Sequence, residues 1–189
     1  MKSIFFFDFE TTGLPVFKEP SGGDNQPHVV QVAAVLCDTE TRKVKQTLDV
    51  IIKPDGFEIP QEVIDVHGIT NEYAHDVGVP EKLAFEMFFA MWNGNLRVAH
   101  NTTFDNRIAR IGTKRFFSEN FQAAWKAGEY VCTMLAARKV MGGKQPKLTE
   151  AYEHFTGKAL EDAHTAIADV NACMEVYWAI QDHTKNAAA

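Results

Sequence analysis

Short apolar stretches in the first third of the chain predict β-strands. Residues 4–8 form an almost wholly apolar run, and residues 28–37 form a second run that is rich in valine. Residues 43–53 alternate apolar and polar side chains, as a strand with one exposed face does. Between the first two runs, residues 15–27 are polar and rich in glycine and proline, which predicts a loop. The short connections favour antiparallel pairing of these three strands.

From residue 60 onward, apolar positions recur at helical spacing and are interrupted by two brief strands, at residues 96–99 and 130–132. Helices are predicted for seven segments: residues 60–66, the residues after Thr70 as an N-cap, 80–92, 104–111, 134–141, 148–155 and 164–181. Three strands followed by alternating helices and strands predict an α/β layered domain with a mixed sheet. We expect residues 1–189 to form a single domain, because one domain suits this length.

Composition places the chain among ordinary globular proteins. Hydrophobic residues make up 46% of the sequence and charged residues 23%. The chain shows neither a signal-peptide pattern nor the run of about twenty apolar residues that a membrane span needs. We therefore expect a cytoplasmic protein without a membrane partner. Cys37, Cys132 and Cys173 lie far apart, which argues against a disulfide framework and against a structural zinc site.

The formal net charge of −6 limits how the chain can meet nucleic acid. Proteins that coat duplex DNA usually carry a basic face that displaces counterions from the phosphates. An enzyme that holds only a strand end through bound cations needs no such face. The charge therefore disfavours a DNA-coating protein and leaves open an enzyme that acts at strand ends. Four cations cluster on one segment, where they either contact phosphates or form a solvated helix face: Arg107, Arg110, Lys114 and Arg115.

Carboxylates recur at the ends of the predicted elements, and the first pair is Asp8 and Glu10. Residues two apart on a strand project from the same face, so both carboxylates can reach one cation. Thr11, Thr12 and Gly13 then predict a tight turn whose amides and hydroxyls can hold a terminal sugar or phosphate. The residues alone leave a second interpretation open, in which both acids are solvated at the surface.

Two further acids stand where later elements begin. Asp105 follows the strand at residues 96–99, at the sheet edge where ligands bind in α/β domains, although it can equally favour a helix N-terminus. Asp169 lies on the last predicted helix, and it converges with His164 if His164 lies on a loop-like first turn with Asp162 as N-cap. A carboxylate on this mostly apolar face is costly to bury without a charged partner. The alternative is that Asp169 simply lies at the border of the buried apolar stripe of this helix.

The four acids together supply only oxygen ligands, which suits Mg²⁺ or Mn²⁺ rather than zinc. In its acidic segments the chain resembles the DEDD superfamily of 3′→5′ exonucleases, in the histidine branch. The segments that carry the resemblance follow the family's order and intervals: residues 8–13 (DFETTG), 67–70 (HGIT), 101–105 (NTTFD) and 164–169 (HTAIAD). Within that superfamily, the chain resembles the catalytic domain of the proofreading subunit of bacterial DNA polymerase III.

The resemblance implies a ribonuclease H-like α/β fold, in which a mixed five-stranded sheet has helices on both faces. It implies that His164 is the general base, a role that suits an imidazole titrating near neutral pH. Two Mg²⁺ or Mn²⁺ ions are the implied cofactors, and their implied ligands are Asp8, Glu10, Asp105 and Asp169. The implied contacts to substrate are Thr11, Thr12, Leu14, Glu62, His67 and Asn101.

On this basis we expect a metal-dependent 3′→5′ exonuclease that releases nucleoside monophosphates from the 3′ end of DNA, with RNA as an alternative substrate. Single-stranded DNA is the expected partner, and the sequence identifies no polymerase or repair protein. A non-catalytic nucleic-acid-binding module is a second hypothesis, which the intact acids and His164 disfavour. A ribonuclease H-like endonuclease or nucleotidyl transferase is a third, which the histidine ahead of Asp169 disfavours.

Overall fold

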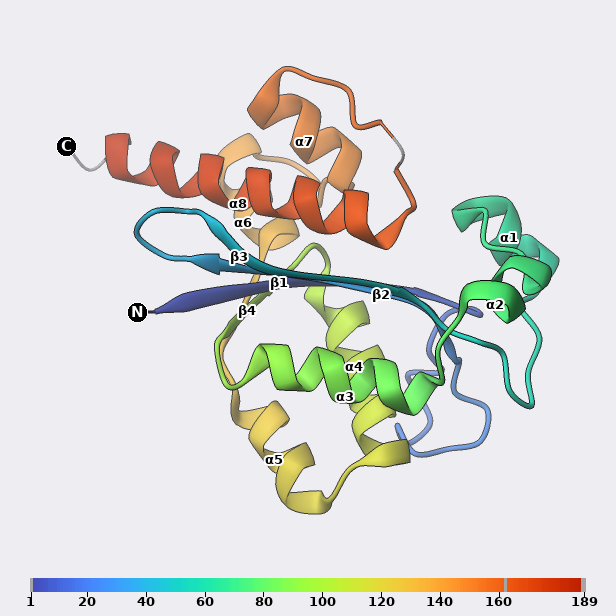
Figure 1. The fold of residues 1–189 in the computed structure, drawn as a ribbon. Coiled ribbons are helices and arrows are strands. Elements are labelled where there is room, and N and C mark those ends of the chain that lie inside the picture. Colours follow the sequence, from blue (N-terminus) through green and yellow to red (C-terminus); the bar gives the residue numbers. More distant parts are fainter. Residues whose placement is uncertain (1, 162, 188–189) are drawn as a thin grey trace.

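A five-stranded sheet forms the centre of the protein, with helices on both of its faces (Figure 1). The computed structural model describes residues 2–161 and 163–187. The strand order is β3-β2-β1-β4-β5, with β1, β2 and β3 antiparallel and with β4 and β5 added in parallel to β1. The strands are β1 (Ser3–Thr11), β2 (Val29–Asp38), β3 (Val44–Ile51), β4 (Leu96–Ala99) and β5 (Tyr130–Cys132). The predicted α/β class and mixed sheet are confirmed.

The helices divide into two layers and a separate pair. One layer, below the sheet in Figure 1, consists of α3 (Glu81–Trp92), α4 (Thr102–Phe116) and α5 (Glu119–Ala127). The other layer consists of α6 (Thr133–Met141), α7 (Leu148–Thr156) and α8 (Ala166–Ala187). Two short helices lie beside the end of the sheet at which β1 ends, α1 (Gln61–His67) and α2 (Asn71–Val77).

Three phenylalanines on one face of β1 pack against the layer that contains α3. Phe5, Phe7 and Phe9 are buried, and the ring of Phe88 lies 5.0, 5.5 and 5.0 Å from their respective ring centroids. Trp125 of α5 completes the cluster, with its ring centroid 5.9 Å from that of Phe7. Burying an aromatic side chain of this size contributes about 1.5–3 kcal/mol. This cluster therefore anchors α3 and α5 to β1.

The opposite face of β1 packs against α8. Ile4 and Phe6 are buried there, and the ring centroid of Phe6 lies 5.4 Å from that of Tyr177. Because side chains alternate along a strand, Asp8 and Glu10 continue this face beyond its apolar part. The same alternation that attaches α8 to the sheet thus directs two carboxylates toward it.

The predicted strands and helices are present, and several of them differ from the prediction in where they begin or end. Both parallel strands have the predicted bounds. Helix α4 extends beyond the predicted residues 104–111 at both ends. Helix α8 begins at Ala166, so His164 precedes it, as the converging arrangement requires. Asp162, the predicted N-cap, lies outside the described residues.

Helix α5 has no counterpart among the predicted elements. Its N-cap is Ser118, whose hydroxyl accepts a hydrogen bond from the backbone N–H of Phe121. Phe117, Phe121 and Trp125 follow one another at four-residue spacing, which is typical of an amphipathic helix. The N-cap and this spacing were therefore available in the sequence.

All three cysteines are free thiols; Cys37 and Cys173 are buried, and Cys132 is half-buried. Among the described residues, no helix combines the length and the apolar character needed to cross a bilayer.

Candidate active site

Asp8, Glu10 and Asp169 form a carboxylate cluster near the carboxyl end of β1. One carboxylate oxygen from each residue lies within 4.8 Å of the others. Strand β1 supplies two of the acids from one face, and α8 supplies Asp169 from its first turn. Oxygens at this spacing can coordinate a single cation. The convergence predicted for these three residues is therefore present.

Burial and mutual repulsion raise the pKa of each acid in the cluster. Removal from water, with the charge of Asp169 adding to it, raises the pKa of Asp8 to about 8. Burial, with Asp8 and Asp169 adding to it, raises the pKa of Glu10 to about 9. The pKa of Asp169 is also raised by burial, although the backbone N–H and the charge of His164 act in the opposite direction. A cation among these oxygens would offset the repulsion.

Asp105 approaches the cluster from α4, in the opposite layer. It is 1% exposed, and its Oδ1 has no hydrogen-bond partner among the described residues. Burial raises its pKa well above the usual range, and the charges of Asp8 and Glu10 raise it further. Backbone N–H groups of Asp105 itself and Phe9 act in the opposite direction. Asp105 thus lies beside the cluster, and within the described part of the chain its buried acceptor oxygen lacks the partner that such groups normally have.

His164 lies on the turn that leads into α8. Its φ of 73° is in the left-handed region, which is uncommon for residues other than glycine and costs of order 1 kcal/mol or more. This backbone places the N–H of His164 within hydrogen-bond reach of the Asp169 carboxylate. The His164 side chain is exposed. An imidazole beside Asp169 and open to water is thus available for proton transfer.

The turn after β1 offers an apolar side chain to solvent and uses both of its threonine hydroxyls internally. Oγ1 of Thr11 donates to the carbonyl of Gly13 at 2.8 Å. Oγ1 of Thr12 accepts from the backbone N–H of His28 at 3.0 Å. Leu14, by contrast, is 81% exposed. Of the predicted contacts in this turn, Leu14 has the most freely accessible side chain.

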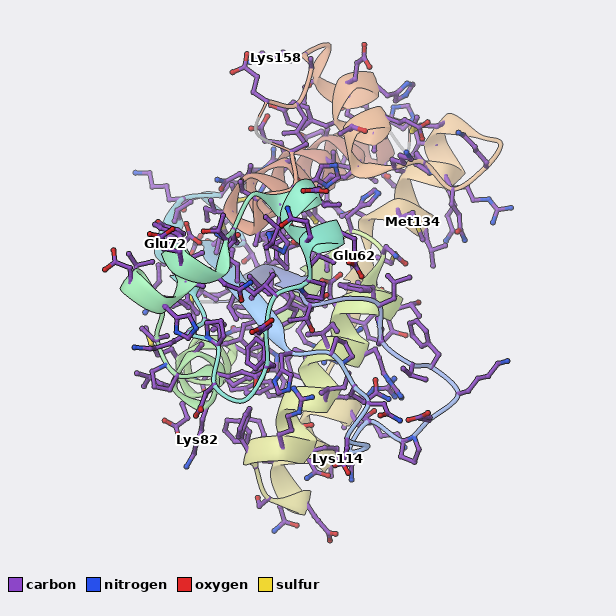
Figure 2. All side chains as sticks on the ribbon, turned by 90° about the vertical axis from the view of Figure 1, so that its right-hand side faces the viewer. Glu62, Glu72, Lys82, Lys114, Met134 and Lys158 are labelled. Carbon is purple, nitrogen blue, oxygen red and sulfur yellow. The ribbon has the colours of Figure 1, made fainter. Side chains whose placement is uncertain are left out.

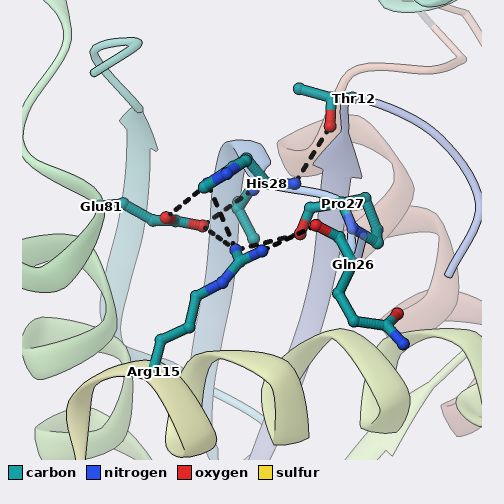
Figure 3. A network of polar contacts seen from close by, with 7 residues as sticks. Thr12, Gln26, Pro27, His28, Glu81 and Arg115 are labelled. Atoms are coloured by element: carbon teal, nitrogen blue, oxygen red, sulfur yellow. Dashed lines mark hydrogen bonds and ion pairs between the residues drawn. The ribbon is translucent and has the colours of Figure 1, made fainter. Parts of the chain in front are cut away.

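A polar network ties this turn to the helices α3 and α4 (Figure 3). The backbone of His28 pairs with Thr12, and Nδ1 of His28 lies 3.0 Å from a carboxylate oxygen of Glu81. Arg115 donates from Nη1 to Glu81 at 3.2 Å and from Nη2 to the carbonyl of Gln26 at 2.7 Å. The network therefore attaches the turn and the residues just before β2 to one rigid layer.

Arg107 holds the middle of the loop at residues 15–27. Its Nη2 donates to the carbonyl of Val16 at 3.0 Å and to the carbonyl of Glu19. The side chain of Gln26 bonds both the N–H and the carbonyl of Val16. Arg107 and Arg115 thus face the loop, so the interpretation as a solvated helix face is wrong for these two. Contact of the four cations with phosphates stays a prediction.

We expect Arg107→Ala to accelerate tryptic cleavage after Lys18 by about tenfold or more. The substitution removes two hydrogen bonds from a charged donor, each of which contributes about 1.5–3 kcal/mol. Limited proteolysis under native conditions, with mass spectrometry to assign the cut, measures the rate. Arg110→Ala is the matched control, because Arg110 lies on the same helix and its side chain makes no hydrogen bond to the described part of the loop. Equal rates in the two variants would contradict the prediction.

The structure also identifies a positioning residue that sequence analysis missed. Gln31 lies opposite Glu10 in the pairing of β1 with β2 and is buried. Its Oε1 accepts from the N–H of Ala166 at 3.1 Å, and its Nε2 donates to Asp49 at 2.7 Å. Gln31 therefore attaches the first residue of α8 to the sheet and helps to orient Asp169. A polar residue within the apolar run of β2 was the available indication.

Three residues that were predicted to contact substrate remain. Among the described residues, none of the three interacts with the carboxylate cluster. Glu62 is exposed on α1, on the side of the molecule shown in Figure 2. His67 is buried; its Nδ1 accepts from the N–H of Ile69 at 3.0 Å, its Nε2 has no described partner, and burial lowers its pKa. Asn101 is exposed at the start of α4 with a φ of 61°. Their contact with substrate stays a prediction.

Comparison with known proteins identifies the family. A family model described as exonuclease, that of RNase T, matches residues 5–177. The chain belongs to the RNase T exonuclease family. The matched segment contains all four candidate acids and His164. No curated protein matches the chain.

Solved structures of exonuclease I share the fold of this RNase T family member. The E. coli enzyme in complex with a dT13 oligonucleotide has a TM-score of 0.75 and 19% identity, over 99% of this chain and 43% of that chain. The zinc-bound E. coli complex with single-stranded DNA has a TM-score of 0.77 and 19% identity, over 98% of this chain and 42% of that chain. The enzyme from Methylocaldum szegediense has a TM-score of 0.77 and 20% identity, over 98% and 41%. The predicted exonuclease fold is confirmed, and the chain spans about two fifths of these relatives.

Proposed function

We propose that this chain is a metal-dependent 3′→5′ exonuclease of the histidine branch, which hydrolyses the terminal phosphodiester of single-stranded DNA and releases nucleoside monophosphates. The observation that carries the proposal is the convergence of Asp8, Glu10 and Asp169 within 4.8 Å, with buried Asp105 beside them. Membership of an exonuclease family supports the nuclease chemistry. The single-stranded DNA bound to exonuclease I of the same fold supports the substrate.

The donor set fits two hard divalent cations. Asp8, Glu10 and Asp169 would hold one cation, and Asp8 with Asp105 would hold the second. The buried Oδ1 of Asp105 has no donor among the described residues. Burial, with repulsion between the acids adding to it, raises the pKa values of Asp8 and Glu10, and bound cations would offset the repulsion. Carboxylate oxygens favour Mg²⁺ or Mn²⁺. When bound, such ions activate water and stabilise the leaving oxygen of an in-line displacement.

The chain's own residues would move the proton and receive the terminal nucleotide. His164 would accept a proton from the attacking water, because its imidazole is exposed beside Asp169. The backbone of the turn at residues 11–13 would approach the terminal sugar or phosphate. Leu14 would pack its exposed apolar side chain against the terminal base or sugar. Glu62, His67 and Asn101 are proposed as further substrate contacts.

Digestion of an oligonucleotide with labelled ends tests this function. With Mg²⁺ and 5′-labelled single-stranded DNA, we expect a ladder that shortens one nucleotide at a time. A matched strand labelled in its 3′-terminal nucleotide should release the label as a mononucleotide in the first turnover. Internal cuts would indicate an endonuclease, and binding without cleavage would indicate a non-catalytic module; either result would overturn the proposal.

An RNA oligomer of the same sequence shows whether the chain distinguishes the sugar, because both nucleic acids share the scissile phosphodiester. The similarity to the polymerase III subunit, a proofreading role and a cytoplasmic location stay predictions.

A further inference from the structure

A pocket surrounded by cations lies between α4, α5 and the sheet edge formed by β4 and β5. Its volume is about 280 Å³. None of the four candidate acids lines it, and no acidic side chain is among the described residues that line it. The lining residues that matter here are Arg97, Thr103, Asn106, Arg110, Lys126 and Tyr130. The pocket is therefore chemically opposite to the carboxylate cluster.

Arg97 is a buried cation without an anionic partner among the described residues. The residue is 2% exposed, and its guanidinium carbon lies 3.8 Å from the ring centroid of Trp125. It donates to the carbonyls of Gly128 at 2.5 Å and of Glu129 at 3.4 Å, and no described carboxylate pairs with it. Burial lowers its pKa to about 10. Fully buried charges are normally paired, so this guanidinium is a candidate partner for an anion.

Two more cations reach the pocket from the helices. Arg110 on α4 and Lys126 in the last turn of α5 are both exposed, and neither belongs to a salt bridge of the described residues. Three cations around one cavity are a local exception in a chain with a net charge of −6. Tyr130 is 57% exposed and adds an aromatic side chain to the same cavity.

We propose that this pocket binds a phosphate group through Arg97, Arg110 and Lys126, as a second anion site outside the carboxylate cluster. Arginine and lysine are the usual partners of phosphate oxygens. The volume is several times the roughly 30 Å³ of one water, so a phosphate fits together with part of an attached sugar. The ring of Tyr130 can then stack on a base. That the phosphate belongs to a nucleotide rests on the proposed function.

Isothermal titration calorimetry of the full chain in EDTA and low salt tests the site. Without divalent cations, neither cleavage nor cation-bridged binding at the carboxylate cluster contributes. The probes are inorganic phosphate, thymidine monophosphate and a short oligothymidylate with free 5′ and 3′ hydroxyls. Binding of the first two identifies a site for free phosphate esters, and binding of the oligonucleotide alone identifies a phosphodiester of the strand. Failure of all three to bind overturns the proposal.

Paired variants assign the binding to this pocket. Arg110→Gln combined with Lys126→Gln is expected to weaken binding by about tenfold or more. The control, Lys139→Gln combined with Lys158→Gln, removes the same charge from exposed positions elsewhere and should leave binding within about twofold. Equal weakening in both double variants overturns the proposal, because net charge would then explain the binding.

Spectra provide a second measurement that does not depend on the variants. In ¹H–¹⁵N spectra of the unmodified chain, a bound probe should shift the amides of Thr103 and Tyr130; shifts confined to other regions overturn the assignment. A chain that binds phosphate here but cleaves no nucleic acid would contradict the proposed function alone. A chain that cleaves normally but binds no probe would contradict this inference alone.

Discussion

Asp8→Ala is expected to slow nucleic-acid cleavage by roughly a thousandfold or more, about 4 kcal/mol of barrier, while the fold stays intact. The charge of Asp8 acts on both Glu10 and Asp105, which places it centrally among the acids. In the proposed site it is the ligand that both cations share, so its loss disrupts both. Single-turnover digestion of end-labelled DNA at saturating Mg²⁺ measures the rate. Full activity in this variant would overturn the metal assignment.

His164→Ala is the control for metal binding, because His164 lies beside the cluster but supplies no oxygen ligand. We expect turnover to fall by about a hundredfold, the usual contribution of a general base. The rise in melting temperature on adding Mg²⁺ should be kept in His164→Ala and lost in Asp8→Ala. The pH–rate profile should lose the ionisation of the base, and an unchanged profile would contradict that role.

The metal-free protein is expected to lose stability as the pH rises from 7 to 9, and Mg²⁺ or Mn²⁺ is expected to restore it. Folding raises the pKa of Asp8 from 3.8 to about 8 and that of Glu10 from 4.5 to about 9. A carboxyl with a raised pKa binds its proton more tightly in the folded state, so its stabilisation is lost as the pH rises toward the folded pKa. Buried His67 and half-buried His100, whose pKa values are lowered from 6.5 by their removal from water, act in the opposite direction only at lower pH.

Thermal unfolding in EDTA at pH 7, 8 and 9, repeated with Mg²⁺, measures this effect. A cation at a hundred times its dissociation constant stabilises the folded state by about 2.7 kcal/mol. Asp8→Asn is the matched variant, because it keeps the side-chain shape and removes one charge. It should flatten the pH dependence and reduce the effect of Mg²⁺. A melting temperature of the metal-free protein that stays constant or rises over this range would contradict the raised pKa values of Asp8 and Glu10 in the folded state.

Local patterns in the sequence were enough to predict most of the elements. Apolar alternation predicted β3, and the brief apolar runs gave β4 and β5 their observed bounds. These patterns suffice because side-chain periodicity depends only on near neighbours. Helix α5 was missed although Ser118 and the spacing of Phe121 and Trp125 indicate it. Tertiary packing of these aromatic side chains against α3 makes the short segment a stable helix.

The sequence by itself determined which side chains are available for chemistry: the acids Asp8, Glu10, Asp105 and Asp169, and the imidazole of His164. Only the tertiary structure decided that three of these acids share a 4.8 Å cluster, that Arg107 turns toward the loop, and that Arg97 is buried with no described carboxylate paired to it. The physical reason is that these relations join residues far apart in the chain. They depend on how α4 and α8 pack onto opposite faces of one sheet, which near-neighbour periodicity does not specify.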